Sequence, residues 1–122
     1  MRGSCVTIWL VIQLLITQDM IYGYTDGIIL RCLAESDNYG YEINRSIARK
    51  TNDRFEMKEA TLYTALRRLE REGYITSYWG VDTKSGGPKR RYYSITENGT
   101  MRLEQCLKEW ADIQELLQIL LA

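Results

Sequence analysis

The chain has 122 residues, enough for one hydrophobic core and too few for a second independent one. It contains no histidine, so the commonest general base, the commonest zinc ligand and every histidine-dependent nucleophile are absent. Its three cysteines form no Cys-x-x-Cys pair, which indicates neither a disulfide framework nor a metal site and favours a reducing cytoplasm. We therefore expect no enzyme, no metal and no cofactor, with Cys32 and Cys106 as small core residues.

The charges are balanced in number but not in position. Residues 58–93 carry eight basic and four acidic side chains, whereas residues 94–122 carry two basic and five acidic ones. A basic middle and an acidic tail are typical of a DNA-facing side followed by a solvent-facing helix, and a chance distribution is the alternative.

The N-terminus begins with an apolar run, residues 6–16, that superficially resembles a signal peptide. Its 11 residues are too few to span a bilayer, which needs about 20. No small-x-small cleavage pattern follows, so export is a minority interpretation. We expect residues 1–18 to be an apolar extension without stable membrane insertion, either a helix that packs on a dimer or an artefact of start-site choice.

Residues 19–35 predict the first domain helix, because five apolar residues recur at a period near 3.6: Ile21, Ile28, Ile29, Cys32 and Leu33. Glycines at 23 and 27 weaken its first turns. Residues 36–38 predict a turn that also caps a second helix, in which Ile43 and Ile47 lie one turn apart. That helix is expected to end at residues 51–53.

The third predicted helix, residues 58–72, has two distinct faces. One carries an apolar stripe typical of a core: Leu62, Leu66 and Leu69. The opposite face carries Ala60, Thr64, Arg67 and Arg71. Major-groove recognition favours short polar side chains near a helix N-terminus with cations beyond them. The sequence thus predicts base contacts by Thr61, Tyr63 and Thr64 and phosphate contacts by Arg67 and Arg71; a merely solvated surface helix is the alternative.

A β-hairpin is expected next. Gly73 predicts a left-handed helix cap, and residues 74–79 are rich in aromatic and β-branched side chains. After a Gly-Gly-Pro turn, residues 89–95 return with alternating faces. The cations Lys89 and Arg90 at the base of this wing predict contact with the minor groove or the backbone of DNA, although such runs often only keep a strand end solvated.

The last helix, residues 97–121 with Thr96 as its cap, carries a heptad seam: Leu103, Cys106, Trp110, Ile113, Leu117 and Leu120. Such a helix is about 37 Å long at 1.5 Å per residue, so a second chain should cover it. A tryptophan in such a seam is more often a core residue than a ligand platform, and Trp110 is the tryptophan of this seam. Across a two-fold axis, however, two indoles could stack a planar aromatic compound.

Several of these stretches together resemble the PadR family of bacterial transcriptional regulators, over about residues 19–113. They are Asp37-Asn38-Tyr39-Gly40-Tyr41-Glu42-Ile43, the run from Glu59 to Glu70, Gly73-Tyr74-Ile75, Tyr78-Trp79-Gly80, and the run from Gly86 to Thr96. With one helix after the wing, the chain is similar to the short, LmrR-like branch of that family. Residues 1–14 have no counterpart in the pattern.

The resemblance implies a mainly α fold with a small β-hairpin: a winged helix-turn-helix domain over residues 19–96 and a dimerisation helix over residues 97–122. It implies a cytoplasmic homodimeric repressor that binds double-stranded operator DNA, with Tyr41 among the contacts. It also implies release by a hydrophobic aromatic effector, since the Trp of Glu109-Trp110 matches a tryptophan that lines a pore in drug-binding members. The alternative is a protein interaction module docked through the apolar N-terminus.

Overall fold

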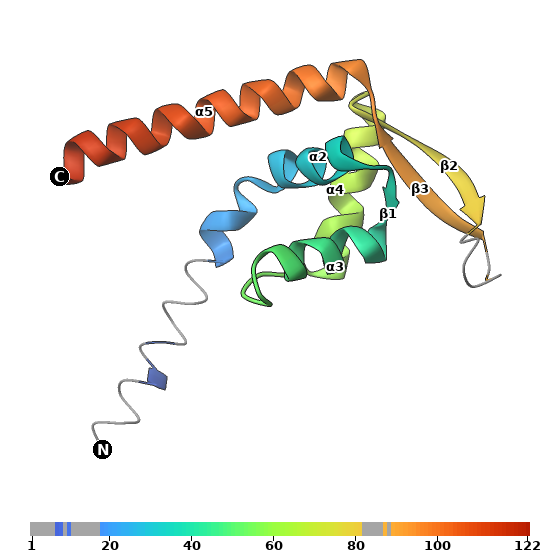
Figure 1. Ribbon diagram of the computed structural model, residues 1–122, viewed down its shortest axis with the longest axis horizontal. Coiled ribbons are helices and arrows are strands. Elements are labelled where there is room, and N and C mark those ends of the chain that lie inside the picture. Colours follow the sequence, from blue (N-terminus) through green and yellow to red (C-terminus); the bar gives the residue numbers. More distant parts are fainter. Residues whose placement is uncertain (1–6, 9, 11–17, 82–86, 88) are drawn as a thin grey trace.

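The computed structural model describes residues 7–8, 10, 18–81, 87 and 89–122 (Figure 1). Most of the predicted apolar extension and the Gly-Gly-Pro turn at the hairpin tip, apart from Gly87, lie outside the described residues. Within the described part of the chain, no helix combines the length and apolar character needed to cross a membrane.

The elements follow the order predicted for a winged helix, with one addition. They are α2 (Thr25–Glu35), β1 (Asn38–Tyr39), α3 (Gly40–Lys50), α4 (Glu59–Arg71), β2 (Ile75–Val81), β3 (Lys89–Ile95) and α5 (Glu97–Leu121). The strands form an antiparallel sheet in the order β1-β3-β2. In Figure 1, α2, α3 and α4 gather at one end of this sheet, the β2–β3 hairpin projects away from them, and α5 runs well beyond the domain.

The structure corrects two of the predicted boundaries. The segment 19–35 is not one helix, because residues 18–22 are helical, Gly23 and Tyr24 form a turn, and α2 begins at Thr25. The Thr25 hydroxyl donates to the Tyr22 carbonyl at 2.6 Å, and glycine contributes little helix propensity, so the break falls here.

Residues 36–38 do not cap the second helix. Asn38 instead enters the short strand β1, where it pairs with Tyr93, and its Oδ1 accepts the N–H of Tyr39 at 3.0 Å. The N-cap position of α3 is Tyr39, and no side chain satisfies it. A strand of two residues carries too short a pattern for sequence periodicity to reveal.

The other helix ends agree with the sequence. Gly73 has a positive φ of 83° after α4, as a left-handed cap requires. Thr96 caps α5, with its Oγ1 accepting the N–H of Gly99 at 3.0 Å.

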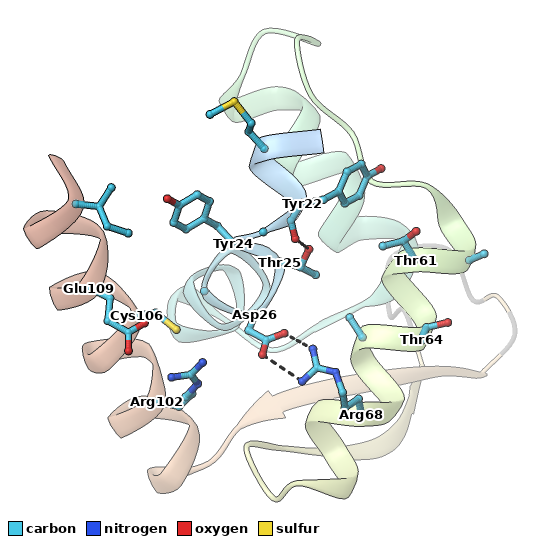
Figure 2. Close-up of a pocket in the computed structure, with 16 residues that line it drawn as sticks. Tyr22, Tyr24, Thr25, Asp26, Thr61, Thr64, Arg68, Arg102, Cys106 and Glu109 are labelled. Atoms are coloured by element: carbon cyan, nitrogen blue, oxygen red, sulfur yellow. Dashed lines mark hydrogen bonds and ion pairs between the residues drawn. The ribbon is translucent and has the colours of Figure 1, made fainter. Parts of the chain in front are cut away.

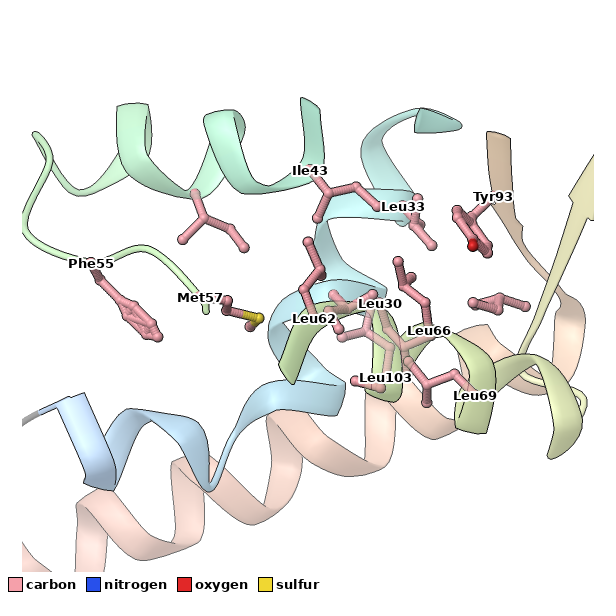
Figure 3. Packing of buried hydrophobic residues seen from close by; sticks show 14 residues of the cluster. Leu30, Leu33, Ile43, Phe55, Met57, Leu62, Leu66, Leu69, Tyr93 and Leu103 are labelled. Atoms are coloured by element: carbon pink, nitrogen blue, oxygen red, sulfur yellow. The ribbon is translucent and has the colours of Figure 1, made fainter. Parts of the chain in front are cut away.

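One hydrophobic core joins all the helices to the sheet (Figure 3). Its buried members are Ile29, Leu30, Leu33, Ile43, Ile47, Phe55, Met57, Leu62, Ala65, Leu66, Leu69, Ile75, Tyr93 and Leu103. The apolar stripe predicted for α4 is fully inside it. Of α5, only the N-terminal part takes part, through Leu103. The core therefore fixes the orientation of α4 and leaves most of α5 uncovered.

The start of α5 is docked so closely that only glycine fits at position 99. A Cβ on Gly99 would clash with the Tyr74 carbonyl oxygen and lie 2.7 Å from Ile95 Cγ1. The same junction is closed by the Thr96 N–H, which donates to that carbonyl at 3.0 Å.

We therefore expect Gly99→Ala to lower the free energy of unfolding by about 2 kcal/mol or more, because the added methyl meets backbone that cannot rotate away. Chemical denaturation measures this. The matched control is Asn98→Ala at the adjacent, exposed position, which should not destabilise the protein. Equal stabilities of the two variants would contradict the close docking.

Candidate nucleic-acid interface

The connection that leads into α4 is fixed by side chains from two other elements. Asn44 of α3 clamps the backbone of Met57: its Nδ2 donates to the carbonyl at 2.8 Å, and its Oδ1 accepts the N–H at 2.9 Å. The Tyr22 hydroxyl accepts the N–H of Lys58, the residue before α4, at 2.8 Å. These bonds satisfy backbone groups beside the helix N-terminus and hold α4 in register with α3 and with the helical residues 18–22 before α2.

The face of α4 opposite the core is open to solvent. Leu62, Ala65, Leu66 and Leu69 are buried, whereas the four residues predicted for the outer face are exposed: Ala60, Thr64, Arg67 and Arg71. Arg67 Nη2 donates to Thr64 Oγ1 at 3.3 Å, so a polar and a cationic side chain already lie together. The orientation of the helix is confirmed, while DNA contact by these residues stays a prediction.

Thr61 and Tyr63, predicted to contact bases with Thr64, lie on opposite edges of this face. The Tyr63 ring is half-buried against the start of α3, where a Cβ on Gly40 would lie only 2.6 Å from its hydroxyl oxygen. Gly40 is thus required for this close approach. Thr61 lies toward the other edge and lines a cavity between α4, α2 and α5, which Ala60 and Thr64 also line (Figure 2). The structure therefore brings Thr64, Arg67 and Arg71 together and sets Thr61 and Tyr63 at the sides.

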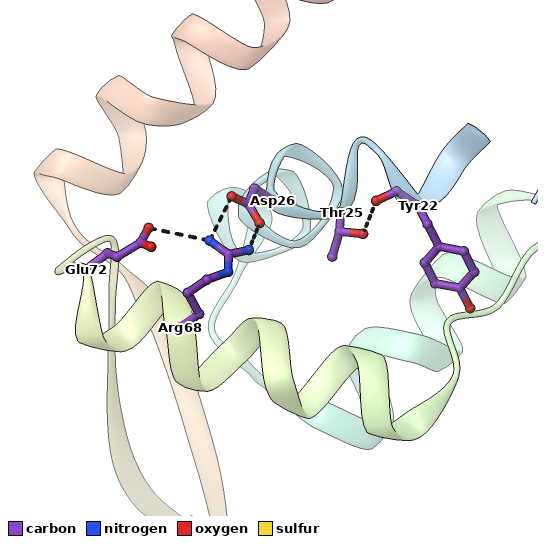
Figure 4. A network of polar contacts seen from close by, with 5 residues as sticks. All are labelled: Tyr22, Thr25, Asp26, Arg68 and Glu72. Atoms are coloured by element: carbon purple, nitrogen blue, oxygen red, sulfur yellow. Dashed lines mark hydrogen bonds and ion pairs between the residues drawn. The ribbon is translucent and has the colours of Figure 1, made fainter. Parts of the chain in front are cut away.

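That cavity has a volume of about 990 Å³ and contains an ion pair that the sequence did not reveal. Arg68 of α4 binds Asp26 of α2 through both of its terminal nitrogens, with Nη1 to Oδ2 at 3.1 Å, and reaches Glu72 at 3.4 Å (Figure 4). The hydrogen bond with Asp26 raises the pKa of Arg68 above its usual value. Arg68 thus ties α4 to α2 and is held away from the outer face.

The carboxylate of Glu70 on α4 binds side chains from both strands of the hairpin. Glu70 accepts hydrogen bonds from the Ser77 hydroxyl and from Arg91 Nη2, the latter at 2.9 Å. The charge of Arg91 is therefore paired on the face of the hairpin that turns toward α4, and both Arg91 and the predicted contact Lys89 are exposed.

The other face of the hairpin is packed by tyrosines. Tyr78 and Tyr92 are stacked at 5.7 Å with an angle of 12° between their rings, and Tyr92 meets Tyr39 edge-on at 5.5 Å. The guanidinium of Arg90 lies over the Tyr39 ring at 4.5 Å. The predicted phosphate contact Arg90 is thus half-buried on this face, and its charge is stabilised by an aromatic ring.

Tyr41, the remaining predicted DNA contact, lies in the first turn of α3 with 63% of its surface exposed. It is two residues from Tyr39, which joins the tyrosine cluster of the hairpin. The predicted contacts therefore come from the first turn of α3, the outer face of α4 and the base of the hairpin.

The heptad seam of α5 is apolar and largely uncovered by its own domain. Leu103 is buried and Cys106 half-buried, but Trp110, Ile113, Leu117 and Leu120 are exposed. Their exposure is expected if a second chain covers them, which stays a prediction.

Trp110 and Cys106 also line a second, smaller cavity of about 410 Å³ between α5, α2 and α3. Its wall is mostly apolar and includes Ile28, Cys32 and Phe55. Burial raises the pKa of both the Cys32 and the Cys106 thiol, so both are protonated at neutral pH. Cys32 packs against the core as predicted but is half-buried, whereas Cys106, also half-buried, lies outside the core beside Gly27.

A profile described as "Transcriptional regulator PadR-like family" matches residues 29–105. The chain is 45% identical over 105 residues to "Uncharacterized protein X" of Lysinibacillus sphaericus, an alignment that covers 86% of this chain and 94% of that protein.

Solved structures agree with this match. A transcriptional regulator from Clostridium thermocellum is 44% identical with a TM-score of 0.74, and the alignment covers 82% of this chain and 92% of that one. A PadR family transcription regulator from Clostridium difficile is 36% identical with a TM-score of 0.68, over 81% of this chain and 99% of that one. Bacillus subtilis PadR in complex with operator DNA shares the fold, at 23% identity and a TM-score of 0.58, over 67% of this chain and 45% of that chain.

Proposed function

Because this chain belongs to the PadR-like family of transcriptional regulators, we propose that it is a sequence-specific repressor that binds operator DNA as a homodimer and releases it when a small aromatic molecule binds. Members of this family are transcription regulators and not enzymes. A cytoplasmic location belongs to the same proposal, because a bacterial chromosome is accessible there.

One observation carries the DNA-binding part of the proposal: α4 turns Thr64, Arg67 and Arg71 outward from a fixed position. A helix in the major groove reads bases with short polar groups and contacts phosphates with cations, which is the composition of this face. Lys89 at the hairpin base extends the cationic surface. The fold shared with Bacillus subtilis PadR, solved with operator DNA, supports the same assignment.

The dimer is supported by the exposed apolar seam of α5. Trp110, Ile113, Leu117 and Leu120 are between 42% and 73% exposed on a helix that its own domain does not cover. A contiguous apolar surface of this kind marks an interface. Two copies related by a dyad would place their α4 helices at half-sites about one helical turn apart, roughly 34 Å.

The effector part of the proposal rests on Trp110. Its indole lines the smaller cavity at the level where α5 passes α2, and the wall there is apolar. A planar aromatic compound could stack on this ring. Such a ligand induces release only if it binds the DNA-free conformation more tightly than the DNA-bound one.

The α4 and hairpin assignments predict separable effects on DNA binding. Lys89→Ala should weaken binding to all sequences. It should also reduce the steepness of the salt slope, the slope of log affinity against log salt concentration, by about one, because one phosphate contact is lost. Arg90→Ala should also weaken all sequences. Thr64→Tyr should instead reduce the preference for operator over random duplex. Fluorescence anisotropy across a salt series measures both quantities.

The matched control is Lys108→Ala, which removes the same charge from an exposed position on α5. An unchanged salt slope in Lys89→Ala would show that this lysine does not contact phosphate. If the wild-type chain selected no duplex from a random pool, DNA binding itself would be refuted.

The α5 seam predicts that Leu117→Glu converts the dimer into a monomer or an unfolded chain, because a carboxylate would be buried among apolar neighbours. Sedimentation velocity reports the mass. Gln118→Glu adds the same carboxylate at the next, exposed position of the helix and should leave the dimer intact. A stable dimer of Leu117→Glu would mean that the seam is not the interface.

The Trp110 assignment predicts that a planar aromatic compound lowers operator affinity in the wild type and that Trp110→Phe responds with at least about tenfold weaker compound affinity. Anisotropy with a labelled operator, titrated with a panel of such compounds, measures the response. If dimeric Trp110→Phe responds with unchanged compound affinity, Trp110 is only a packing residue.

A further inference from the structure

The face of the hairpin that turns toward α4 ends in two large apolar side chains that the described residues leave open. Trp79 is 68% exposed and Val81 is 49% exposed. In the antiparallel register Trp79 pairs with Arg91 and Val81 pairs with Lys89. Directly opposite residues share one face of a sheet, so these four side chains form one surface. Ser77 and Arg91 on that same face bind Glu70, which shows that the surface continues from α4.

The position of this surface is fixed by the packing behind it. A Cβ on Gly80 would lie 2.7 Å from Cδ2 of Tyr92, so the tyrosine ring lies directly over the glycine. The same ring is stacked on Tyr78, and the hydroxyl of Tyr78 donates to Asp37 at 2.6 Å. This bond raises the pKa of Tyr78 and ties β2 back to the segment before α3. The exposed indole of Trp79 therefore lies on a strand pair whose position is fixed by these contacts.

The chemistry around Trp79 favours a polyanion with apolar edges. Lys89 and Arg91 share this face with Trp79, Arg91 being paired with Glu70, and Arg67 and Arg71 are exposed on the adjoining helix. A protein partner that bound only the indole would have to desolvate these charges or supply carboxylates for them. A DNA duplex supplies phosphates on both sides of a minor groove whose walls are the apolar edges of deoxyribose sugars, and proteins insert apolar side chains there.

We propose that Trp79, supported by Val81, forms an apolar contact with the minor groove of the operator next to the segment met by α4, while Lys89 contacts a flanking phosphate. The inference rests on the proposed DNA-binding function and adds a contact that does not depend on charge. Phosphate contacts release counterions and weaken with salt, whereas an apolar contact does not. Trp79 and Lys89 should therefore be distinguishable in one experiment.

The experiment uses the full-length wild-type chain and the duplex that it selects from a random-sequence pool. Affinity is measured over a salt series for Trp79→Ala, Trp79→Phe, Lys89→Ala and the control Met101→Ala, an exposed apolar residue on α5. We expect Trp79→Ala to bind about tenfold more weakly at every salt concentration with an unchanged slope, and Trp79→Phe to keep part of the affinity. Lys89→Ala should change the slope, and Met101→Ala should change nothing.

A second measurement guards against effects on folding. The difference in tryptophan emission between wild type and Trp79→Phe isolates Trp79, and DNA should protect this emission from acrylamide. Binding by Trp79→Ala equal to wild type, or an indole as accessible to acrylamide with DNA as without it, overturns the inference while leaving the proposed function standing. Failure of the wild type to select any duplex overturns both. Weaker self-association of Trp79→Ala with normal DNA binding would assign the surface to a second copy of the chain and also overturn the inference.

Discussion

The position of α2 between α4 and α5 determines where both functional surfaces lie. On one side, Asp26 binds Arg68 and holds α4. On the other, the next residue, Gly27, lets α5 pass so closely that an added Cβ would lie 3.3 Å from the Cβ of Cys106. Adjacent residues of one helix turn thus contact the element that would read DNA and the element that would form the dimer.

The hairpin is oriented by a comparable two-sided arrangement. Glu70 anchors one of its faces to α4, and the stack of Tyr78, Tyr92 and Tyr39 supports the other. The partly exposed ion pair with Arg91 is worth little by itself at a solvent-screened position. Its role is geometric, because it links both strands to the helix, while the aromatic contacts and the buried Ile75 and Tyr93 add stabilisation.

The sequence predicted the elements that have strong periodicity. The apolar stripe of α4, the alternating faces of β3 and the full extent of α5 with its Thr96 cap all agree with the structure. The break at Gly23 and the strand β1 were not predicted, because each depends on a few hydrogen bonds and not on a repeated pattern.

For the candidate DNA-binding site, the sequence predicted the residue types better than it predicted their arrangement. Thr64, Arg67 and Arg71 do share one exposed face, since helical spacing alone decides that. The sideways positions of Thr61 and Tyr63 depend on what α2 and α3 place beside the helix. The pairing of Asp26 with Arg68 joins residues 42 positions apart, and no local pattern links them.

The contact between Gly40 and Tyr63 also restricts how this regulator can evolve. Any side chain at position 40 would meet the far end of the Tyr63 side chain, so a mutation there requires the ring to move or position 63 to become smaller. In the proposed complex, positions 40 and 63 are therefore coupled, and a change on either helix alters the fit of the other.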